Sequence, residues 1–274
     1  MKPCLPAILV GTMMAGMLPI TSGTVSASPP NNPPAAAMTE RIVDLPLGGG
    51  QHQRVLYDAP AHPRATLVML PGGSGDVGEM RDGDMRHGEN FVIRTRAQWI
   101  ARGYAVLIPD TIDRANLRGV RSSPDYARLV DELAAFARQQ VPRPVFLLGT
   151  SQGSIAAMNG AAHARPGLIA GIVLTESVSV MGHSGETVFD ADPQDVRVPA
   201  LVVANRADQC DVAPPTMAPR IAAAMRSSPD AHVLMVDGGV SRSDKSCGSL
   251  SPHGYYGIEG TVVAKIGGWL DAHS

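Results

Sequence analysis

The chain has 274 residues, enough for one domain with a sizeable core, or for one domain with a small addition. Hydrophobic residues make up 44% of the sequence and charged residues 18%, which excludes a chain that is disordered over most of its length. The formal net charge of −2 provides no basic surface and argues against nucleic acid as a partner. Composition therefore predicts a soluble globular protein.

The N-terminus has the pattern of an export signal. Lys2 provides a positive start, an apolar stretch runs from Leu5 to Ile20, and Val25-Ser26-Ala27 ends in the small residues that signal peptidase prefers. The stretch is short and interrupted for a membrane-spanning helix, which needs about 20 apolar residues. We predict a signal peptide over residues 1–27, with a retained anchor as the alternative, and a flexible leader over residues 28–40. The mature protein is expected to be periplasmic or secreted and to have no stable membrane span.

Short apolar runs after the leader predict strands. The first two, separated by three glycines, predict an antiparallel hairpin. Most later runs are nearly continuous in apolar residues, as expected for strands that are covered on both faces. In chain order the runs are Arg41–Leu45, Arg54–Tyr57, Ala65–Leu70, Tyr104–Ile108, Val145–Leu148, Gly171–Thr175, Ala200–Ala204 and His232–Val236.

Helical patterns alternate with these strands. The clearest helix begins at Ser123, a serine cap that is followed by Pro124 at the first helical position. Further helices are predicted over Phe91–Ala101, Gln152–His163, Pro215–Met225 and Gly257–Ala272. The alternation predicts an α/β fold over residues 41–274, with a mostly parallel central sheet and helices on both faces. The segment between the strands Gly171–Thr175 and Ala200–Ala204 is too short for a large cap domain.

One junction carries a chemical motif. The strand Val145–Leu148 is followed by Gly149-Thr150-Ser151-Gln152-Gly153 and then by a helix rich in small residues. G-x-S-x-G between a strand and a helix is the pattern of a nucleophile elbow, a strained turn that lifts the serine above the sheet edge. The helix N-terminus favours negative charge developing on a substrate. Ser151 is thus the candidate nucleophile, and an incidental serine in a glycine-rich turn is the alternative.

From about Arg41 to the C-terminus, the motif and its context resemble the α/β-hydrolase superfamily, and in particular small exported esterases and lipases. The resemblance implies an acid and then a histidine on later loops. The histidine takes the serine's proton, and the acid fixes the histidine tautomer. His253 lies in the loop between the last strand and the final helix, where the family places its base. His232 and His273, the other histidines after the predicted acid loop, lie in a strand and in the C-terminal tail.

The acid is expected just after the strand Ala200–Ala204. Asp208 stands at the place that matches the family's acid turn. Two alternatives stay open: Asp211, three residues further on, and Glu176, at the end of the preceding strand.

Two cysteines, Cys210 and Cys247, are left when the signal segment is removed. An even pair in an exported chain predicts a disulfide, with two free thiols as the alternative. Such a bond would tie the acid loop to the histidine loop, as in small exported hydrolases whose catalytic loops are cross-linked.

The resemblance also implies an oxyanion hole with two backbone donors. One is Gln152, and the other is Gly73 or Ser74 in the loop Pro71–Gly75. No Lys-Ser/Thr pair follows these glycines, which argues against a phosphate-binding loop; a plain tight turn is the alternative. The sequence carries no cofactor signature and no metal-ligand spacing on a recognisable element, so we expect neither group.

These features predict a serine hydrolase that cleaves an ester-type acyl bond through a Ser-His-Asp triad and an acyl-enzyme intermediate. The expected substrate is a small-molecule or polymer-attached acyl compound; esters are the default, and thioesters, amides or lactones would use the same machinery. An acyltransferase with the same triad and a non-catalytic binding protein with this fold are the competing classes. The oligomeric state stays open.

Overall fold

The computed structural model describes residues 40–47, 51–78, 85 and 87–274 of the chain. The predicted signal peptide, residues 1–27, lies outside these ranges, as does all but the last residue of the predicted leader, residues 28–40. Both segments therefore stay predictions.

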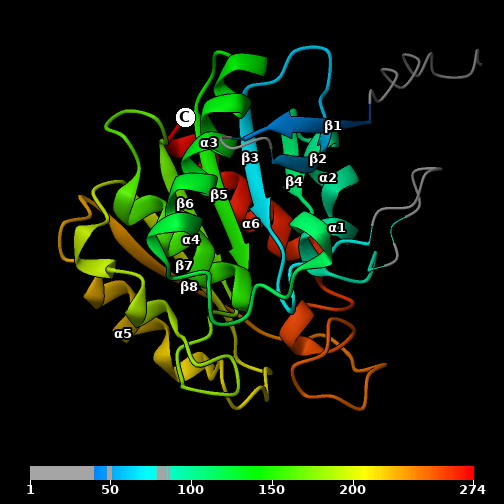
Figure 1. The fold of residues 1–274 in the computed structure, drawn as a ribbon. Coiled ribbons are helices and arrows are strands. Elements are labelled where there is room, and N and C mark those ends of the chain that lie inside the picture. Colours follow the sequence, from blue (N-terminus) through cyan, green and yellow to red (C-terminus); the bar gives the residue numbers. More distant parts are fainter. Residues whose placement is uncertain (1–39, 48–50, 79–84, 86) are drawn as a thin grey trace, which may run out of the picture. The chain divides into compact units, whose positions relative to one another are not determined.

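An eight-stranded sheet forms the centre of the described part of the chain, with strand order β1-β2-β4-β3-β5-β6-β7-β8 (Figure 1). The strands are β1 (Arg41–Pro46), β2 (His52–Asp58), β3 (Ala65–Leu70), β4 (Tyr104–Pro109), β5 (Val145–Thr150), β6 (Gly171–Thr175), β7 (Ala200–Asn205) and β8 (Ala231–Val236). β1 and β2 form an antiparallel hairpin, β2 is antiparallel to β4, and the other neighbouring pairs are parallel. The predicted hairpin and the mostly parallel sheet are confirmed.

Helices cover both faces of this sheet, as predicted. They are α1 (Phe91–Arg94), α2 (Arg96–Ala101), α3 (Pro124–Gln140), α4 (Gln152–His163), α5 (Ala218–Ala224) and α6 (Glu259–Ala272). In Figure 1, α4 lies in front of the sheet and α6, drawn in red, lies behind it. Alternate residues of β3 enter the two cores: Val68 and Leu70 pack with α3 and α4, whereas Leu67 and Met69 pack with α1, α2 and α6. Burial on both faces explains why β3 is apolar throughout.

The predicted helix Phe91–Ala101 is divided at Thr95. The hydroxyl and the N–H of Thr95 both donate to the carbonyl of Phe91, at 2.8 and 3.0 Å, and Thr95 itself is buried. A threonine that bonds back to the preceding turn competes with the regular helical ladder. Phe91, the first residue of α1, lines the same cavity as Gly73.

Two further helices begin later than predicted. The segment Pro215–Met225 starts with the 3-10 helix η5 (Pro215–Met217), and α5 begins only at Ala218. Pro219 has no N–H to offer to the preceding turn, which favours a helix start at this point. The last helix begins two residues after Gly257, since that glycine has a φ of +89°, outside the helical region.

The connection between β6 and β7 is short. It contains the 3-10 helices η3 (Val188–Asp190) and η4 (Pro193–Asp195), so the described residues include no large cap domain. Within the described ranges, no helix combines the length and the apolarity that crossing a membrane requires. The parallel strands β3, β5, β6 and β7 all end at one edge of the sheet, and the loops at this edge carry the predicted site residues.

Candidate active site

Ser151 occupies a sharp turn between β5 and α4. Its φ and ψ are 52° and −122°, a conformation that a non-glycine residue adopts only at a cost of about 1–3 kcal/mol. The flanking glycines allow the turn to form: a Cβ on Gly149 would lie 2.2 Å from the carbonyl oxygen of Gly153, and a Cβ on Gly153 would lie 2.0 Å from that of Leu70. The G-x-S-x-G spacing is therefore a steric requirement of this junction.

The acid turn follows β7. The N–H of Asp208 donates to the carbonyl of Asn205, and the N–H of Cys210 donates to Asp208 Oδ1 at 2.8 Å. The side chain of Asn205 donates to the carbonyls of Gly238 and Pro252, each at 2.9 Å. Asn205 thus fastens the acid turn to the loop that carries the histidine. Sequence reasoning missed this function of Asn205. The only signal for it in the sequence is a polar residue at the end of a buried strand.

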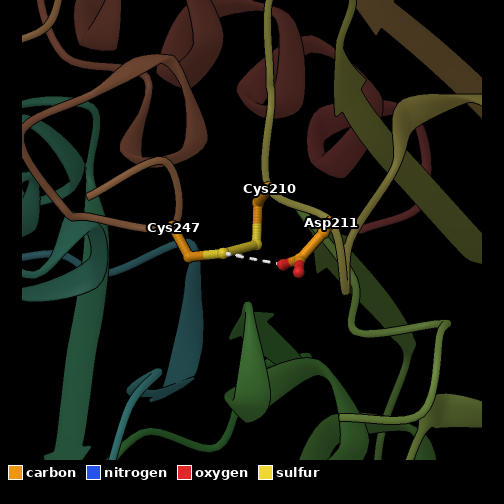
Figure 2. A group of neighbouring side chains, drawn as sticks. All are labelled: Cys210, Asp211 and Cys247. Carbon is orange, nitrogen blue, oxygen red and sulfur yellow. Dashed lines mark hydrogen bonds between the residues drawn. A yellow bond between two sulfur atoms is a disulfide. The ribbon is translucent and has the colours of Figure 1, made fainter. Parts of the chain in front are cut away.

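A disulfide joins the same two loops, as predicted. Cys210 and Cys247 are bonded, and Figure 2 shows the bond running between the loop after β7 and the loop before α6. Asp211 lies beside this bond, with its Oδ1 3.7 Å from the Cys247 sulfur. The carboxylate of Asp211 therefore contacts the disulfide.

The histidine loop ends in the 3-10 helix η6 (Pro252–Gly254). The hydroxyl of Ser251 caps it by accepting from the N–H of His253 at 3.2 Å. Arg94, at the end of α1, donates to the carbonyl of Gly254 at 2.6 Å and forms an ion pair with Glu259 at 2.9 Å. A guanidinium with several donors fixes such a loop better than one hydrogen bond does. No sequence motif marks Arg94 for this function.

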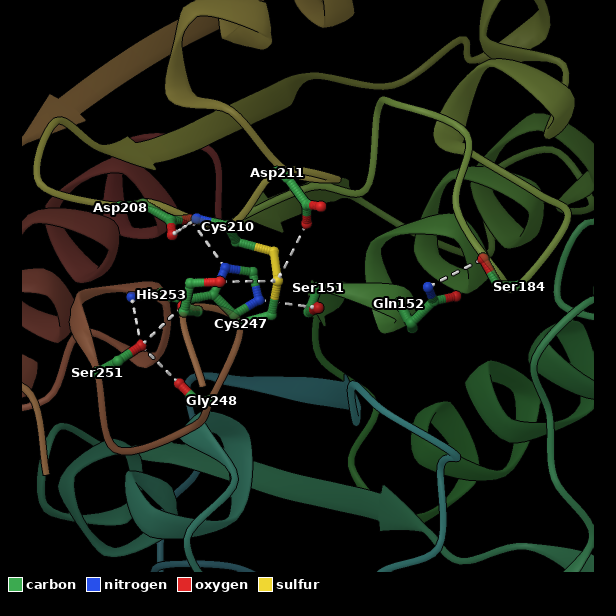
Figure 3. Close-up of a disulfide and its surroundings, with 11 residues drawn as sticks. Ser151, Gln152, Ser184, Asp208, Cys210, Asp211, Cys247, Gly248, Ser251 and His253 are labelled. Carbon is green, nitrogen blue, oxygen red and sulfur yellow. Dashed lines mark hydrogen bonds and ion pairs between the residues drawn. A yellow bond between two sulfur atoms is a disulfide. The ribbon is translucent and has the colours of Figure 1, made fainter. Parts of the chain in front are cut away.

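These loops bring Ser151, His253 and Asp208 into one hydrogen-bonded line (Figure 3). His253 Nδ1 lies 2.8 Å from Asp208 Oδ2, and Nε2 lies 3.0 Å from Ser151 Oγ. Because an ionised carboxylate can only accept, this pairing places the imidazole proton on Nδ1 and leaves Nε2 able to accept from the serine. His253 is 4% exposed and the Asp208 side chain is fully buried, so water competes little for either hydrogen bond.

The two alternatives for the acid occupy different places. Asp211 faces the disulfide and is exposed. Glu176 is fully buried behind Asp208, and one donor atom from each of Glu176, Asp208 and His253 lies within 4.8 Å of the others. Desolvation by burial, and next the charge of Asp208, raises the pKa of Glu176 well above its usual value. In the structure, Asp208 is the carboxylate that contacts the histidine.

The loop after β3 passes in front of Ser151. A Cβ on Gly72 would lie 3.1 Å from the Ser151 Cβ, and Gly73 has a φ of +61°. Among the described residues, no acceptor binds the backbone N–H of Gly73, Ser74 or Gln152. Three unpaired backbone donors beside one hydroxyl form a site suited to an anionic oxygen.

A buried arginine, Arg121, forms a hydrogen bond with this loop. Arg121 is 1% exposed and donates to the carbonyl of Pro71 at 3.3 Å. The carbonyl of Ser74 accepts from the N–H of Leu117 at 2.9 Å. The loop is thus held through carbonyl groups on both sides of Gly73, and these contacts leave the N–H groups of Gly73 and Ser74 unused. Sequence reasoning missed Arg121.

A cavity of about 390 Å³ opens above the serine. Its described lining is mostly polar and comprises Gly72, Gly73, Ser74, Asp76, His87, Glu89, Asn90, Phe91, Arg118, Thr150, Ser151, Lys245, Cys247, Gly248, Ser249, His253 and Gly254. Phe91 supplies the only apolar hydrocarbon side chain among them. The cavity connects Ser151, His253 and the Gly73 loop with solvent.

Two groups of side chains among the described residues have the spacing of metal ligands: Cys210, Asp211 and Cys247, and Glu176, Asp208 and His253. In the first group both sulfur atoms are consumed by the disulfide. In the second, His253 Nδ1 is already paired with Asp208. Neither group therefore offers a free set of donors.

Comparisons with known proteins identify the fold. No family model matches the sequence, and a search of curated proteins finds no match. Among solved structures, the chain is similar to an esterase of Pyrococcus furiosus, at a TM-score of 0.63 and 11% identity over 90% of this chain and 96% of that one. It is also similar to a dienelactone hydrolase of Anabaena variabilis, at a TM-score of 0.58 and 17% identity over 86% and 98%.

A third similar structure is an esterase of Butyrivibrio proteoclasticus, Est1E, with ferulic acid bound. It has a TM-score of 0.55 and 12% identity over 85% of this chain and 98% of that one. Similarity over nearly the whole of each protein, together with the sheet order, shows that this chain has the α/β-hydrolase fold.

Proposed function

We propose that this α/β-hydrolase-fold protein is a serine hydrolase that cleaves ester bonds, with Ser151 as nucleophile, His253 as base and Asp208 as the orienting acid. The observation that carries the proposal is the continuous hydrogen-bonded line from Ser151 Oγ through the His253 ring to Asp208. A serine hydroxyl is a weak nucleophile until a base accepts its proton, and the base must be held in one tautomer.

The reaction would proceed in two halves. Ser151 Oγ attacks the ester carbonyl carbon while Nε2 of His253 takes the hydroxyl proton. The tetrahedral intermediate collapses, His253 returns the proton to the departing alcohol, and an acyl-serine is left. Water then attacks the acyl group by the same proton route and releases the acid. Asp208 stays ionised and stabilises the imidazolium in each half.

The oxyanion of each intermediate would be held by backbone N–H groups. Gln152 donates from the first turn of α4, and Gly73 or Ser74 donates from the opposite loop. In serine proteases, the loss of one such donor lowers kcat by about 10²–10³-fold. The unpaired state of these three N–H groups supports this assignment.

The polar cavity supports a preference for short acyl groups and polar alcohols. A long acyl chain gains binding energy only from apolar surface, and Phe91 is the single apolar hydrocarbon side chain in the described lining. Arg118 and Lys245 on the rim, with Asp76 and Glu89, offer partners for polar groups. We expect kcat/KM for p-nitrophenyl acetate to exceed that for the octanoate at least tenfold. A preference for the octanoate would contradict this substrate class.

Export is part of the same proposal. A disulfide persists in an oxidising compartment, and the pattern of residues 1–27 is that of a signal peptide. N-terminal sequencing of the protein recovered outside the cytoplasm should begin after Ala27. A protein that retains Met1 in the cytoplasmic fraction would contradict this part.

A fluorophosphonate probe tests the central claim. It should label the purified protein at Ser151, and Ser151→Ala should remove both the adduct and the hydrolysis of p-nitrophenyl acetate. Ser241→Ala, at an exposed position in the histidine loop, is the matched control and should keep both. Labelling elsewhere, or none in folded protein, would contradict the proposed nucleophile.

A further inference from the structure

Glu176 has no function in the proposed mechanism, yet its carboxyl group lies close to Asp208 and His253. It follows β6, is fully buried and has a φ of 43°, in the left-handed region that non-glycine residues avoid. A buried carboxyl group on strained backbone is unfavourable for stability, and such strain clusters at functional sites. The presence of a glutamate at this position therefore needs a chemical explanation.

The hydrogen bonds of Glu176 are incomplete for an ionised carboxylate. Oε1 accepts from the N–H of Asn205 at 2.9 Å, but Oε2 is buried and receives no hydrogen bond from any described residue. The side chains that face Glu176 are Asp208, His253 and Tyr255. The Tyr255 hydroxyl donates to the carbonyl of Val203 at 3.1 Å; its hydrogen bonding toward Glu176 lowers the pKa of that carboxyl group, but less than burial and Asp208 raise it.

A second buried carboxylate, that of Glu186, serves as a comparison because both of its oxygens accept hydrogen bonds. Glu186 is 2% exposed, and both of its oxygens accept hydrogen bonds: Oε1 from the N–H of Gly119 at 2.8 Å, and Oε2 from the N–H and hydroxyl of Ser122 at 2.9 and 3.0 Å. Glu186 is therefore satisfied as an anion. Glu176 has one donor where Glu186 has three, and a second carboxylate as its neighbour.

We propose that Glu176 is protonated in the resting protein and donates a hydrogen bond from Oε2 to the carboxylate of Asp208. This inference rests on the proposed function of Asp208. A proton on Oε2 turns the unpaired acceptor into a donor, and Asp208 has lone pairs to accept it besides those that bind Cys210 N and His253 Nδ1. Two buried anions within 4.8 Å of each other would repel strongly, and protonation removes that repulsion.

Glu176 is then a positioning residue. Its hydrogen bond holds the Asp208 side chain, and it partly neutralises the carboxylate that stabilises the imidazolium. Through Asn205, which contacts Glu176 by its N–H and Pro252 by its side chain, the same carboxyl group also reaches the histidine loop. Removal of the donor should therefore change how readily the enzyme loses activity in acid.

The pH dependence of kcat/KM tests this. In Glu176→Gln, the amide oxygen can accept from Asn205 and the NH₂ group can donate to Asp208, so the midpoint of the acid limb should stay within about 0.3 pH units of the wild-type value. Glu176→Met removes the donor and should raise that midpoint by about one pH unit and lower kcat at least tenfold, with KM nearly unchanged. A Gln variant whose acid limb moves down by a full unit would mean that Glu176 carries a charge and would overturn the proposal, as would a Met variant with the wild-type profile.

Infrared difference spectroscopy gives a readout that does not depend on activity or on the Met variant folding. In Ser151→Ala protein at pH 7, the carboxylic acid C=O band should disappear on adding Glu176→Gln and persist on adding the matched Glu186→Gln. Absence of a band that depends on Glu176 would overturn the inference. A band in the Ser151→Ala protein, together with no fluorophosphonate labelling of the folded wild-type protein, would leave the protonation standing and refute the proposed function instead, so the two failures are distinguishable.

Discussion

The nucleophile and the acid–base pair of the candidate site are held in place in different ways. Ser151 lies in a turn whose shape follows from its immediate neighbours. Only glycine fits at positions 149 and 153, because a Cβ at Gly149 or Gly153 would clash with the surrounding backbone. Asp208 and His253 are 45 residues apart, and the loops that carry them are joined by a disulfide and by side-chain hydrogen bonds. The elbow is thus a local steric device, whereas the acid–base pair is a product of tertiary structure. The first should be broken by adding a single methyl group, and the second by cutting cross-links.

The largest effect is expected from the acid itself. Asp208→Ala removes the acceptor of the Nδ1 proton and should lower kcat/KM by roughly 10⁴-fold, since the histidine loses its fixed tautomer. Asp211→Ala, three residues away and facing the disulfide, should stay within about threefold of the wild type. Steady-state kinetics on p-nitrophenyl acetate measure both. A loss below about tenfold for Asp208→Ala would assign the acid to Glu176 or Asp211.

Removal of the disulfide tests the tertiary half of the site. Cys210→Ser combined with Cys247→Ser releases a cross-link with a sequence separation of 37, and the free energy of unfolding should fall by about 4 kcal/mol. Because the bond joins the two loops, kcat/KM should also fall by about tenfold. Urea unfolding measures the change in stability, and steady-state kinetics measure the change in kcat/KM. An unchanged kcat/KM at reduced stability would show that the hydrogen bonds of Asn205 and Arg94 suffice to position His253.

A single methyl group tests the local half. Gly153→Ala places a Cβ where it would meet the Leu70 carbonyl oxygen at 2.0 Å, and should lower the free energy of unfolding by about 3 kcal/mol and kcat/KM by about 10²-fold. Gly268→Ala is the matched control, since its added Cβ meets nothing within 4 Å on the exposed side of α6. It should stabilise the protein by up to about 1 kcal/mol. Equal behaviour of the two variants would contradict the steric account of the elbow.

The same division explains what the sequence could predict. The elbow, the strands and the capped helix at Ser123 depend on residues close together in the chain. The strands were predicted with ends displaced by at most two residues, and the predicted start of the helix at Ser123 is confirmed. Arg94, Asn205 and Arg121 were missed. Each bonds a carbonyl 160, 47 or 50 residues away, and neither periodicity nor a motif encodes such a distance. Asp208 was preferred as the acid, but Asp211 and Glu176 stayed open because all three carboxylates follow neighbouring strands, and only the packed structure shows which one contacts His253.

The smallest effect concerns the stability of the buried Glu176. Its pKa is raised above the usual 4.5 by burial and by the Asp208 charge, so the folded state holds a proton that the unfolded state releases as the pH rises past that value. The contribution of Glu176 to stability is therefore lost with rising pH, by up to about 1.4 kcal/mol per pH unit, until the folded-state pKa is reached. Glu176→Gln cannot ionise, so the free energy of unfolding of the variant minus that of the wild type should grow between pH 5 and pH 8. Glu186→Gln is the matched control and should show no such growth, because both oxygens of Glu186 already accept hydrogen bonds in the folded protein. Urea titrations across this pH range measure the difference, and a constant value for Glu176→Gln would mean that both states ionise alike.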